Sequence, residues 1–183
     1  MKNLIIIPAR LESTRLPNKP LADINGESMI AHVYKRAKEA NIAHVIVAAG
    51  NVEIKEAIET IGGEAILTNP DHASGSDRIY EALNKYDKEA KFDTIINLQG
   101  DLPNIHKDAL SKIVSLLESS NADISTLGVK ISSEEEFLNP NIVKAYVKNI
   151  SESNYVDDFD RRFDIGKENF LYHHVGIYGY KRK

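Results

Sequence analysis

Short β-branched runs alternate with stretches of helical periodicity over the first two-thirds of this sequence, and no other feature constrains the fold as much. Residues 4–7 form an apolar run typical of a buried strand, and residues 29–40 place apolar side chains at helical spacing. Strands that are joined by helices run parallel, because each helix carries the chain back across the sheet. The sequence therefore predicts an α/β fold in which helices cover both faces of a mostly parallel sheet.

The pattern changes after about residue 132. Two strand-like segments, 142–147 and 170–180, are joined by an acidic, irregular stretch at 155–164, and they predict antiparallel additions near the carboxyl-terminal end. No repeat or linker interrupts the chain, so we expect a single domain over residues 1–183. The other strands are expected at 44–49, 65–67, 94–98 and 124–129, and the other helices at 51–61, 76–86 and 107–119.

The composition limits the chemistry that the chain can perform. Its 183 residues include no cysteine, which excludes disulfides, zinc–thiolate sites and a thiol nucleophile. The formal net charge of −4 argues against broad binding to nucleic acid or to an anionic membrane. No apolar run is long enough to span a bilayer and no signal peptide is recognisable, so we expect a cytoplasmic protein. An anionic ligand must therefore be bound by a local cluster of Arg and Lys.

One such cluster follows the first predicted strand, at the end of the sheet where ligands bind in folds of this kind. Arg10, Arg15 and Lys19 lie within ten residues, with the hydroxyl residues Ser13 and Thr14 between them. These groups suit a polyphosphate, because guanidinium, ammonium and hydroxyl groups all donate to its oxygens. A solvated connecting loop is the alternative interpretation. The spacing of a Walker A loop and the glycines of a dinucleotide fingerprint are absent.

Residues 8–21 read Pro-Ala-Arg-x-x-Ser-Thr-Arg-Leu-Pro-x-Lys-Pro-Leu, and this long string resembles the N-terminal signature of the 3-deoxy-manno-octulosonate (Kdo) cytidylyltransferases. The resemblance implies a three-layer, Rossmann-like nucleotidyltransferase fold. It also implies that Arg10 and Lys19 contact the phosphates of CTP and stabilise charge during catalysis. The residues expected to support them at the nucleotide are Ala9, Ser13 and Arg15.

A second segment, His-Ala-Ser-Gly-Ser-Asp-Arg at residues 72–78, lies between a predicted strand and a predicted helix. Taken alone, its serines are explained by capping of that helix. The string resembles the segment that lies beside the cytosine ring in the same family. The resemblance therefore places Ser74, Gly75 and Arg78 at the nucleotide.

A third segment, Gln99-Gly100-Asp101, follows the apolar strand 94–98. A carboxylate after a glycine at the carboxyl end of a strand is a natural Mg²⁺ ligand, and a turn aspartate ahead of Pro103 is the alternative. The family carries its metal-binding aspartate in Gln-Gly-Asp-Glu-Pro, although residue 102 is Leu here. The resemblance implies that Asp101 is a catalytic metal ligand and that Gln99 lies at the nucleotide.

A fourth segment, residues 170–180, contains the adjacent residues His173 and His174. Neighbouring side chains on a strand point to opposite faces, so the pair is not expected to hold one metal ion. The family carries His-x-Gly-Ile-Tyr-x-Tyr, which matches from His174 onward. The resemblance implies that His174 and Tyr178 bind the sugar acid, whereas His173 is expected to be a surface or packing residue.

The sequence departs from the family pattern in three places. Gly50 stands where the family has the aspartate of Ala-Thr-Asp, and the Ser-Arg-x-x-Ile-Pro segment that supplies a sugar-binding arginine is not recognisable. The sequence also stops at Lys183, before the family's C-terminal helical segment and its metal-binding aspartate. These losses affect sugar and metal binding, so we expect CTP binding to withstand them better than catalysis does.

The activity implied by the resemblance is nucleotidyl transfer for lipopolysaccharide synthesis. The anomeric hydroxyl of Kdo would attack the α-phosphate of CTP in the presence of Mg²⁺, and pyrophosphate would leave. The expected partners are CTP, Kdo and a second copy of the chain, with no nucleic acid and no membrane. Two alternatives stay open: a non-catalytic CTP-binding remnant that needs a partner fragment, and a transferase for another sugar acid.

Overall fold

The structure is a computed structural model that describes residues 2–12, 16–147, 155–162 and 170–182. The chain divides into two compact units, and each is described by itself below. The first unit comprises Met1–Ser125 and Ile177–Lys183, and the second comprises Thr126–Gly176. The expected single nucleotidyltransferase domain over residues 1–183 stays a prediction.

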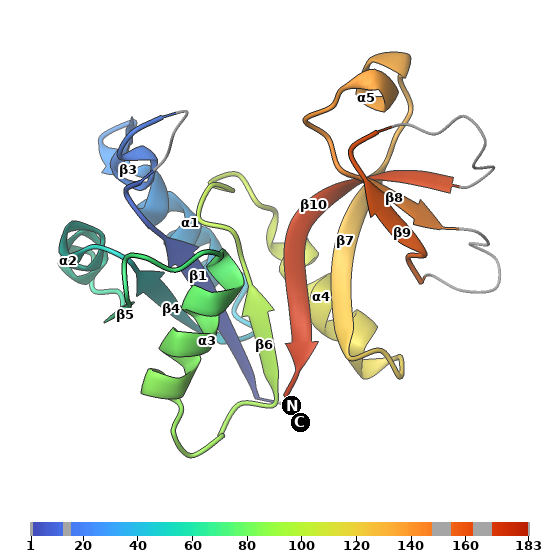
Figure 1. Cartoon of the computed structure of the whole chain (residues 1–183). Helices are drawn as coiled ribbons and strands as arrows, with labels where there is room; N and C mark the ends of the chain where they lie inside the picture. The colour runs from blue at the N-terminus through green and yellow to red at the C-terminus, as the bar shows by residue number, and fades with distance from the viewer. Residues whose placement is uncertain (1, 13–15, 148–154, 163–169, 183) are drawn as a thin grey trace. The chain divides into compact units, whose positions relative to one another are not determined.

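The first unit is built on a parallel sheet (Figure 1). Its centre is the run of consecutive buried residues Leu4–Ile7, which is the run expected of a strand covered on both faces. The last part of β10 (Phe170–Lys181) adds an antiparallel strand beside β6, with Tyr178 opposite Asn97. The parallel strands run in the order β5 (Ala65–Leu67), β4 (His44–Ala49), β1 (Asn3–Ala9) and β6 (Thr94–Asn97). The predicted mostly parallel sheet with antiparallel additions is confirmed.

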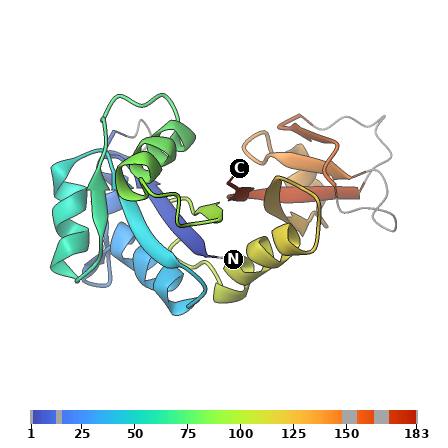
Figure 2. The same cartoon turned by 90° about the horizontal axis from the view of Figure 1, so that it is seen from below.

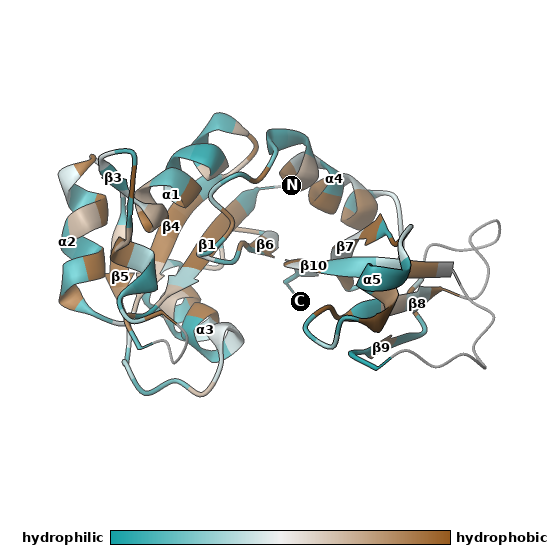
Figure 3. Cartoon of the chain, turned by 90° about the horizontal axis from the view of Figure 1, so that it is seen from above, coloured by the Kyte–Doolittle hydropathy of each residue, from teal (hydrophilic) through white to brown (hydrophobic). Residues whose placement is uncertain are grey.

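Helices cover both faces of this sheet, with α1 (Met29–Glu39) on one face and α3 (Gly75–Tyr86) on the other (Figures 2 and 3). The alternation of side chains along β1 explains this arrangement. Leu4 and Ile6 pack with Ile79 of α3 in one core cluster, so the side chains between them point to the opposite face. The remaining large helices are α2 (Val52–Thr60) and α4 (Lys107–Glu118). Each of the four presents an apolar stripe to the interior and polar residues to solvent.

Three helices are preceded by a residue whose side chain is able to cap them, and one of these side chains does so. Ser74 caps α3, since its hydroxyl accepts a hydrogen bond from the Asp77 backbone N–H at 3.2 Å. Asn51 directly precedes α2, but its side chain makes no capping bond there. Ser28 precedes α1 in the same way and also makes none. A cap position can be predicted from residue type, whereas the side chain's partner depends on the neighbouring loops.

Several short elements were not predicted from the pattern, because they are too short to show a periodicity. The turn between β2 (Asp23–Ile24) and β3 (Glu27–Ser28) places Asn25 at φ 53° and Gly26 at φ 88°, which is the left-handed pair that two-residue hairpins require. The others are the 3₁₀ turn η1 (Lys19–Leu21), the helix α5 (Glu134–Leu138) and the strand β9 (Asp158–Asp160).

The second unit is a small antiparallel assembly in which β8 (Lys144–Val147) pairs with β9 on one side and with the first part of β10 on the other. The strand β7 (Ile124–Lys130) pairs with β10 and continues into this unit from the first. A small core of Ile131, Tyr146 and Leu171 holds it together. Lys144 is fully buried, and its ammonium group donates to the carbonyl oxygens of Asn139 and Arg161 at 2.6 and 2.8 Å.

Within the described residues, none of the helices has both the length and the apolar character that crossing a membrane requires.

Candidate active site

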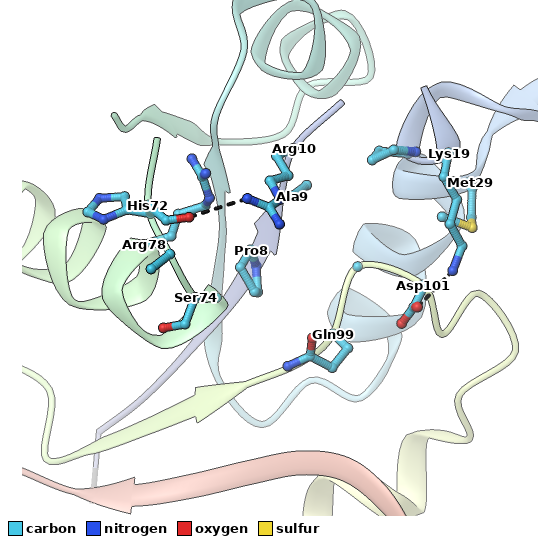
Figure 4. A pocket seen from close by; sticks show the side chains of 14 residues that line it. Pro8, Ala9, Arg10, Lys19, Met29, His72, Ser74, Arg78, Gln99 and Asp101 are labelled. Atoms are coloured by element: carbon cyan, nitrogen blue, oxygen red, sulfur yellow. Dashed lines mark hydrogen bonds and ion pairs between the residues drawn. The ribbon is translucent and has the colours of Figure 1, made fainter. Parts of the chain in front are cut away.

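A pocket of about 260 Å³ opens in the first unit at the carboxyl ends of β1 and β6 (Figure 4). This is the edge at which parallel α/β sheets bind ligands, and the volume is near the lower end of the roughly 300–1,000 Å³ typical of small-molecule sites. The structure brings most of the residues predicted from the sequence into this pocket. Those that line it are Ala9, Arg10, Lys19, Ser74, Gly75, Arg78, Gln99 and Asp101.

The other predicted residues lie elsewhere. Ser13 and Arg15 fall outside the described residues. Tyr178 belongs to the first unit, where it stacks on Tyr180 with ring centroids 6.1 Å apart, and it is not among the residues that line the pocket. His174 belongs to the second unit, where its Nε2 lies 2.9 Å from the hydroxyl of Thr126. Burial raises the pKa of Tyr178 and lowers the pKa of His174. Their role in binding a sugar acid stays a prediction.

Arg10 stands at the end of β1, where the chain leaves the sheet. Its guanidinium donates to the carbonyl oxygen of His72 at 3.3 Å and is otherwise exposed toward the pocket. The next residue, Leu11, donates its backbone N–H to the side-chain oxygen of Asn51 at 3.0 Å. The amide of Asn51 also donates to Glu12 at 3.1 Å. Asn51 therefore fixes the start of the first loop, which is why it does not cap α2.

We expect Asn51→Ala to loosen this loop without disrupting the sheet. The substitution removes the acceptor for Leu11 and the donor to Glu12, so stability should fall by about 1 kcal/mol, the net value of a typical hydrogen bond. CTP affinity, measured by calorimetry, should fall by a few-fold because Arg10 would be less well fixed. Asn84→Ala, at an exposed position on α3, is the control: it should leave CTP affinity unchanged and should not lower stability, because alanine is the better helix former. Equal affinities for Asn51→Ala and the unaltered protein would contradict the expectation.

Lys19 and Asp101 form an ion pair across the pocket. Lys19 Nζ lies 2.8 Å from Asp101 Oδ2, and both side chains are partly exposed. Lys19 comes from η1, which the chain enters through the left-handed residue Asn18. Asp101 follows Gly100, where an added Cβ would lie 2.9 Å from the carbonyl oxygen of Pro8. Glycine at this position allows the Asp101 loop to approach β1 closely.

Arg78 is almost fully buried beside the pocket, at 2% exposure. Its guanidinium donates to the hydroxyl of Thr68 at 2.7 Å and to the carbonyl oxygens of Asn69 and Pro70 at 2.9 and 3.0 Å. Burial lowers its pKa, and the nearby Arg10 adds to this effect. The geometry indicates that Arg78 holds the loop before α3 in place, in addition to lining the pocket.

Gly50 occupies the space next to this guanidinium. A Cβ added at residue 50 would lie 2.6 Å from Arg78 Nη1, so a larger residue there requires the arginine to move. The backbone N–H of Gly50 donates to Ala9 at 2.8 Å, which joins the end of β4 to the end of β1. At the position where the family pattern has an aspartate, the Arg78 guanidinium therefore occupies the space that a Cβ would need.

Several residues of the pocket could not be identified from the sequence. Pro20 and Met29 line it with apolar surface, yet a methionine at helical spacing is more often a core residue. His72 takes part through its backbone carbonyl, which any residue type could supply. Its position inside the recognised string at residues 72–78 was the one signal available.

The pocket offers a limited metal-binding set. Asp101 is the one carboxylate that lines it among the described residues, and those residues contain no group of three or more His, Cys, Asp or Glu side chains able to hold a metal ion. Mg²⁺ is commonly bound by one or two carboxylates together with substrate phosphates and water. The residues present therefore fit a Mg²⁺ ion that arrives with a nucleotide.

A comparison with known proteins identifies the family of this chain. A family model described as Cytidylyltransferase matches residues 4–183, which is nearly the whole chain. The chain belongs to the cytidylyltransferase family. The resemblance on which the sequence-based predictions depend is thereby confirmed.

Individual relatives of this cytidylyltransferase bear closely similar names. It is 43% identical to a 3-deoxy-manno-octulosonate cytidylyltransferase of Paramagnetospirillum magneticum, over 98% of this chain and 74% of the relative. It is 48% identical to a protein of the same name from Brucella suis, over 100% of this chain and 73% of the relative. A solved structure of CMP:2-keto-3-deoxy-manno-octonic acid synthetase complexed with CTP has a TM-score of 0.85 and 38% identity, over 99% of this chain and 74% of that one. These matches confirm the predicted Rossmann-like nucleotidyltransferase fold.

Proposed function

We propose that this cytidylyltransferase transfers CMP from CTP to Kdo, for lipopolysaccharide synthesis. The observation that carries the proposal is the pocket at the sheet edge, which Arg10, Lys19 and Asp101 all line, in a chain that is similar to Kdo cytidylyltransferases over 98–100% of its own length. The anomeric oxygen of Kdo forms a bond to the α-phosphorus, and the bond from that phosphorus to the β-phosphate oxygen breaks. The hydroxyl proton goes to solvent, and pyrophosphate leaves with the bonding electrons.

The residues contribute mainly by positioning the nucleotide and by compensating charge. Arg10 and Lys19 neutralise the triphosphate, whose charge increases on the departing pyrophosphate. Lys19 is held by Asp101 in the structure, 2.8 Å away, and must exchange this partner for phosphate when the nucleotide binds. We assign the remaining nucleotide contacts to Ala9, Ser13, Arg15, Ser74, Gly75, Arg78 and Gln99, and contacts with the sugar acid to His174 and Tyr178.

Mg²⁺ is the metal that we propose for this site, with Asp101 as its protein ligand. When bound, the ion neutralises phosphate charge and orients the reacting oxygen. Occupation of Asp101 by a cation also removes the partner that holds Lys19. Metal and nucleotide should therefore support each other's binding. The metal binds Asp101 and so frees Lys19 for phosphate, while the phosphate binds Lys19 and so frees Asp101 for the metal.

We also propose that the protein acts in the cytoplasm as a homodimer, with CTP and Kdo as its small-molecule partners. The absence of cysteine and the formal net charge of −4 agree with a reducing compartment and with the lack of a nucleic-acid or anionic-membrane partner. Light scattering of the purified chain measures the number of subunits directly, and a monomer at micromolar concentration would contradict the dimer.

A coupled assay for pyrophosphate release tests the activity. The full chain is incubated with CTP, Mg²⁺ and a panel of sugar acids that includes Kdo and an acylneuraminate. Turnover with Kdo supports the proposal. Turnover with another acid in place of Kdo contradicts the assigned acceptor, and CTP binding without turnover on any acid contradicts the assigned activity.

A further inference from the structure

One face of α3 holds the loop that connects β5 to α3, residues 68–74. Arg78, Glu81 and Lys85 lie three and four residues apart, so their side chains share this face of the helix. Arg78 fixes the first half of the loop through the three bonds described above. Lys85 donates to the carbonyl oxygen of Leu67 at 2.9 Å, just before the loop begins. Ser74 ties the end of the loop to α3 through Asp77, and Glu81 holds His72 between these two anchors.

The Glu81 carboxylate is the meeting point of three donors. It accepts the backbone N–H of Asn69 at 3.0 Å, contacts Nε2 of His72, and pairs with Lys85 Nζ at 2.6 Å. The side chain is 24% exposed, so the carboxylate is partly shielded from water. Lys85, the Asn69 N–H and His72 together lower the pKa of Glu81 to about 2. The group therefore keeps its negative charge, and with it these contacts, at neutral pH.

His72 connects Glu81 to the pocket. Its ring is held by Glu81, and its backbone carbonyl accepts the hydrogen bond from the Arg10 guanidinium at 3.3 Å (Figure 4). Glu81 is not among the residues that line the pocket, whereas His72 and Arg10 both are. The path from Glu81 to Arg10 thus passes through His72, by way of its ring on one side and its carbonyl on the other.

We propose that Glu81 is a positioning residue for Arg10: by fixing His72, it orients the Arg10 guanidinium toward the phosphates of the nucleotide. This inference rests on the proposed function, in which Arg10 binds those phosphates. A flexible arginine on an exposed loop loses conformational freedom when it binds, and a partner that holds it in advance reduces that loss. Because Arg78 holds the first half of the loop independently, loss of Glu81 should release His72 while residues 68–70 stay in place.

Calorimetry on the full chain tests the proposal with a double-mutant cycle. Glu81→Ala should weaken CTP binding roughly fivefold to tenfold, the scale of one net hydrogen bond. Glu81→Gln keeps an acceptor oxygen and should lose less. In an Arg10→Met background, Glu81→Ala should cause no further loss, because the residue through which it acts is already gone. Glu89→Ala removes a carboxylate that is 75% exposed just beyond the same helix, and it should leave CTP affinity unchanged.

A second ligand separates positioning from general damage to the loop. Cytidine lacks the phosphates, so its binding, measured by saturation-transfer NMR, should be the same in Glu81→Ala and in the unaltered protein. Equal losses of affinity for cytidine and for CTP in Glu81→Ala would overturn the proposal. So would a double variant in which Glu81→Ala and Arg10→Met each weaken CTP binding by the same factor as they do alone. If Glu81→Ala does not fold, Glu81→Gln replaces it in the cycle, and it should likewise cause no further loss of CTP affinity in the Arg10→Met background. Failure of the unaltered protein to bind CTP would instead overturn the proposed function, and this inference with it.

Discussion

Asp101→Asn should lower the rate of pyrophosphate release by about a hundredfold to a thousandfold, the range observed when one charge-stabilising group is removed from an active site. Asparagine has nearly the size of aspartate and keeps one acceptor oxygen, but it cannot supply the negative charge that a Mg²⁺ ligand needs. Because Asp101 is the one carboxylate lining the pocket within the described part of the chain, no neighbour replaces it. The assay is the coupled pyrophosphate measurement with Kdo and saturating CTP.

The same substitution should not weaken nucleotide binding when metal is absent. Asp101 repels the triphosphate and also occupies Lys19, whose Nζ lies 2.8 Å from its carboxylate. Removing the charge frees Lys19, so CTP affinity in the presence of a chelator should stay equal or increase. Lys19→Met should decrease that affinity. This divergence between binding and turnover distinguishes a metal ligand from a residue that merely maintains the fold.

Asp108→Asn is the matched control, since this aspartate lies in the first turn of α4 with a side chain that is 66% exposed. Its turnover should stay within twofold of the unaltered protein. Turnover of Asp101→Asn at the same level, at equal Mg²⁺ concentration, would show that the carboxylate binds no catalytic metal. A parallel loss of CTP binding in chelator would show that Asp101 supports the loop instead.

The contrast between Asp101 and Arg78 shows how far the sequence could predict this site. The location of Asp101 at the sheet edge was predicted because its place depends on local order: an apolar strand ends, a glycine follows, and the carboxylate comes next. Its role as a metal ligand came from the family resemblance and stays a prediction. The alternation of strands and helices likewise predicted which loops meet at one edge of the sheet. Both predictions depend on periodicity, which is a property of the chain itself.

The contacts of Arg78 depend on segments that are distant in sequence. The family resemblance of residues 72–78 implied that Arg78 lies at the nucleotide. Nothing in the local sequence indicates that its guanidinium lies against Gly50 or donates to Asn69 and Pro70. Asn51 is similar: its position before α2 predicts a cap, and its bonds to Leu11 and Glu12 form because the first loop packs there. Side-chain partners of this kind are decided by tertiary packing, after residue type has fixed only what each group is able to donate or accept.

The second large effect concerns stability. Asp87 directly follows α3 and its side chain is only 2% exposed, yet it accepts backbone N–H groups of Lys91 and Phe92 at 2.9 and 3.1 Å. Arg182, which follows β10, donates to the same carboxylate at 2.5 Å. Arg182 is 24% exposed, so the burial lies mainly on the Asp87 side, and removing Asp87 leaves both the guanidinium charge and the two backbone N–H groups without their partner. Asp87→Ala should therefore lower the free energy of unfolding by about 3–5 kcal/mol at neutral pH, measured by urea denaturation.

The pH dependence of stability identifies the source of this effect. Burial alone would raise the pKa of Asp87, but the two backbone N–H groups and the Arg182 guanidinium outweigh it and lower the pKa below its usual value. A carboxyl whose pKa is lower in the folded state contributes stability above its unfolded pKa, near 3.9, and that contribution disappears as the pH falls through the folded pKa. In the unaltered protein, stability should therefore decline steadily below about pH 4.

Asp87→Asn should be less stable than the unaltered protein at pH 7 and should lose less stability on acidification, so the two curves converge at low pH. Some acid dependence should persist, since Glu81 also has a pKa lowered to about 2. Arg182→Leu should reproduce part of both effects, because it removes one of the groups that lower the pKa of Asp87. Asp93→Asn changes an exposed carboxylate that accepts the Lys2 N–H nearby, so it should shift stability by no more than about 0.5 kcal/mol. Parallel curves for Asp87→Asn and the unaltered protein would mean that the Asp87 carboxyl titrates alike in the folded and unfolded chain, and its contribution would then have to come from packing.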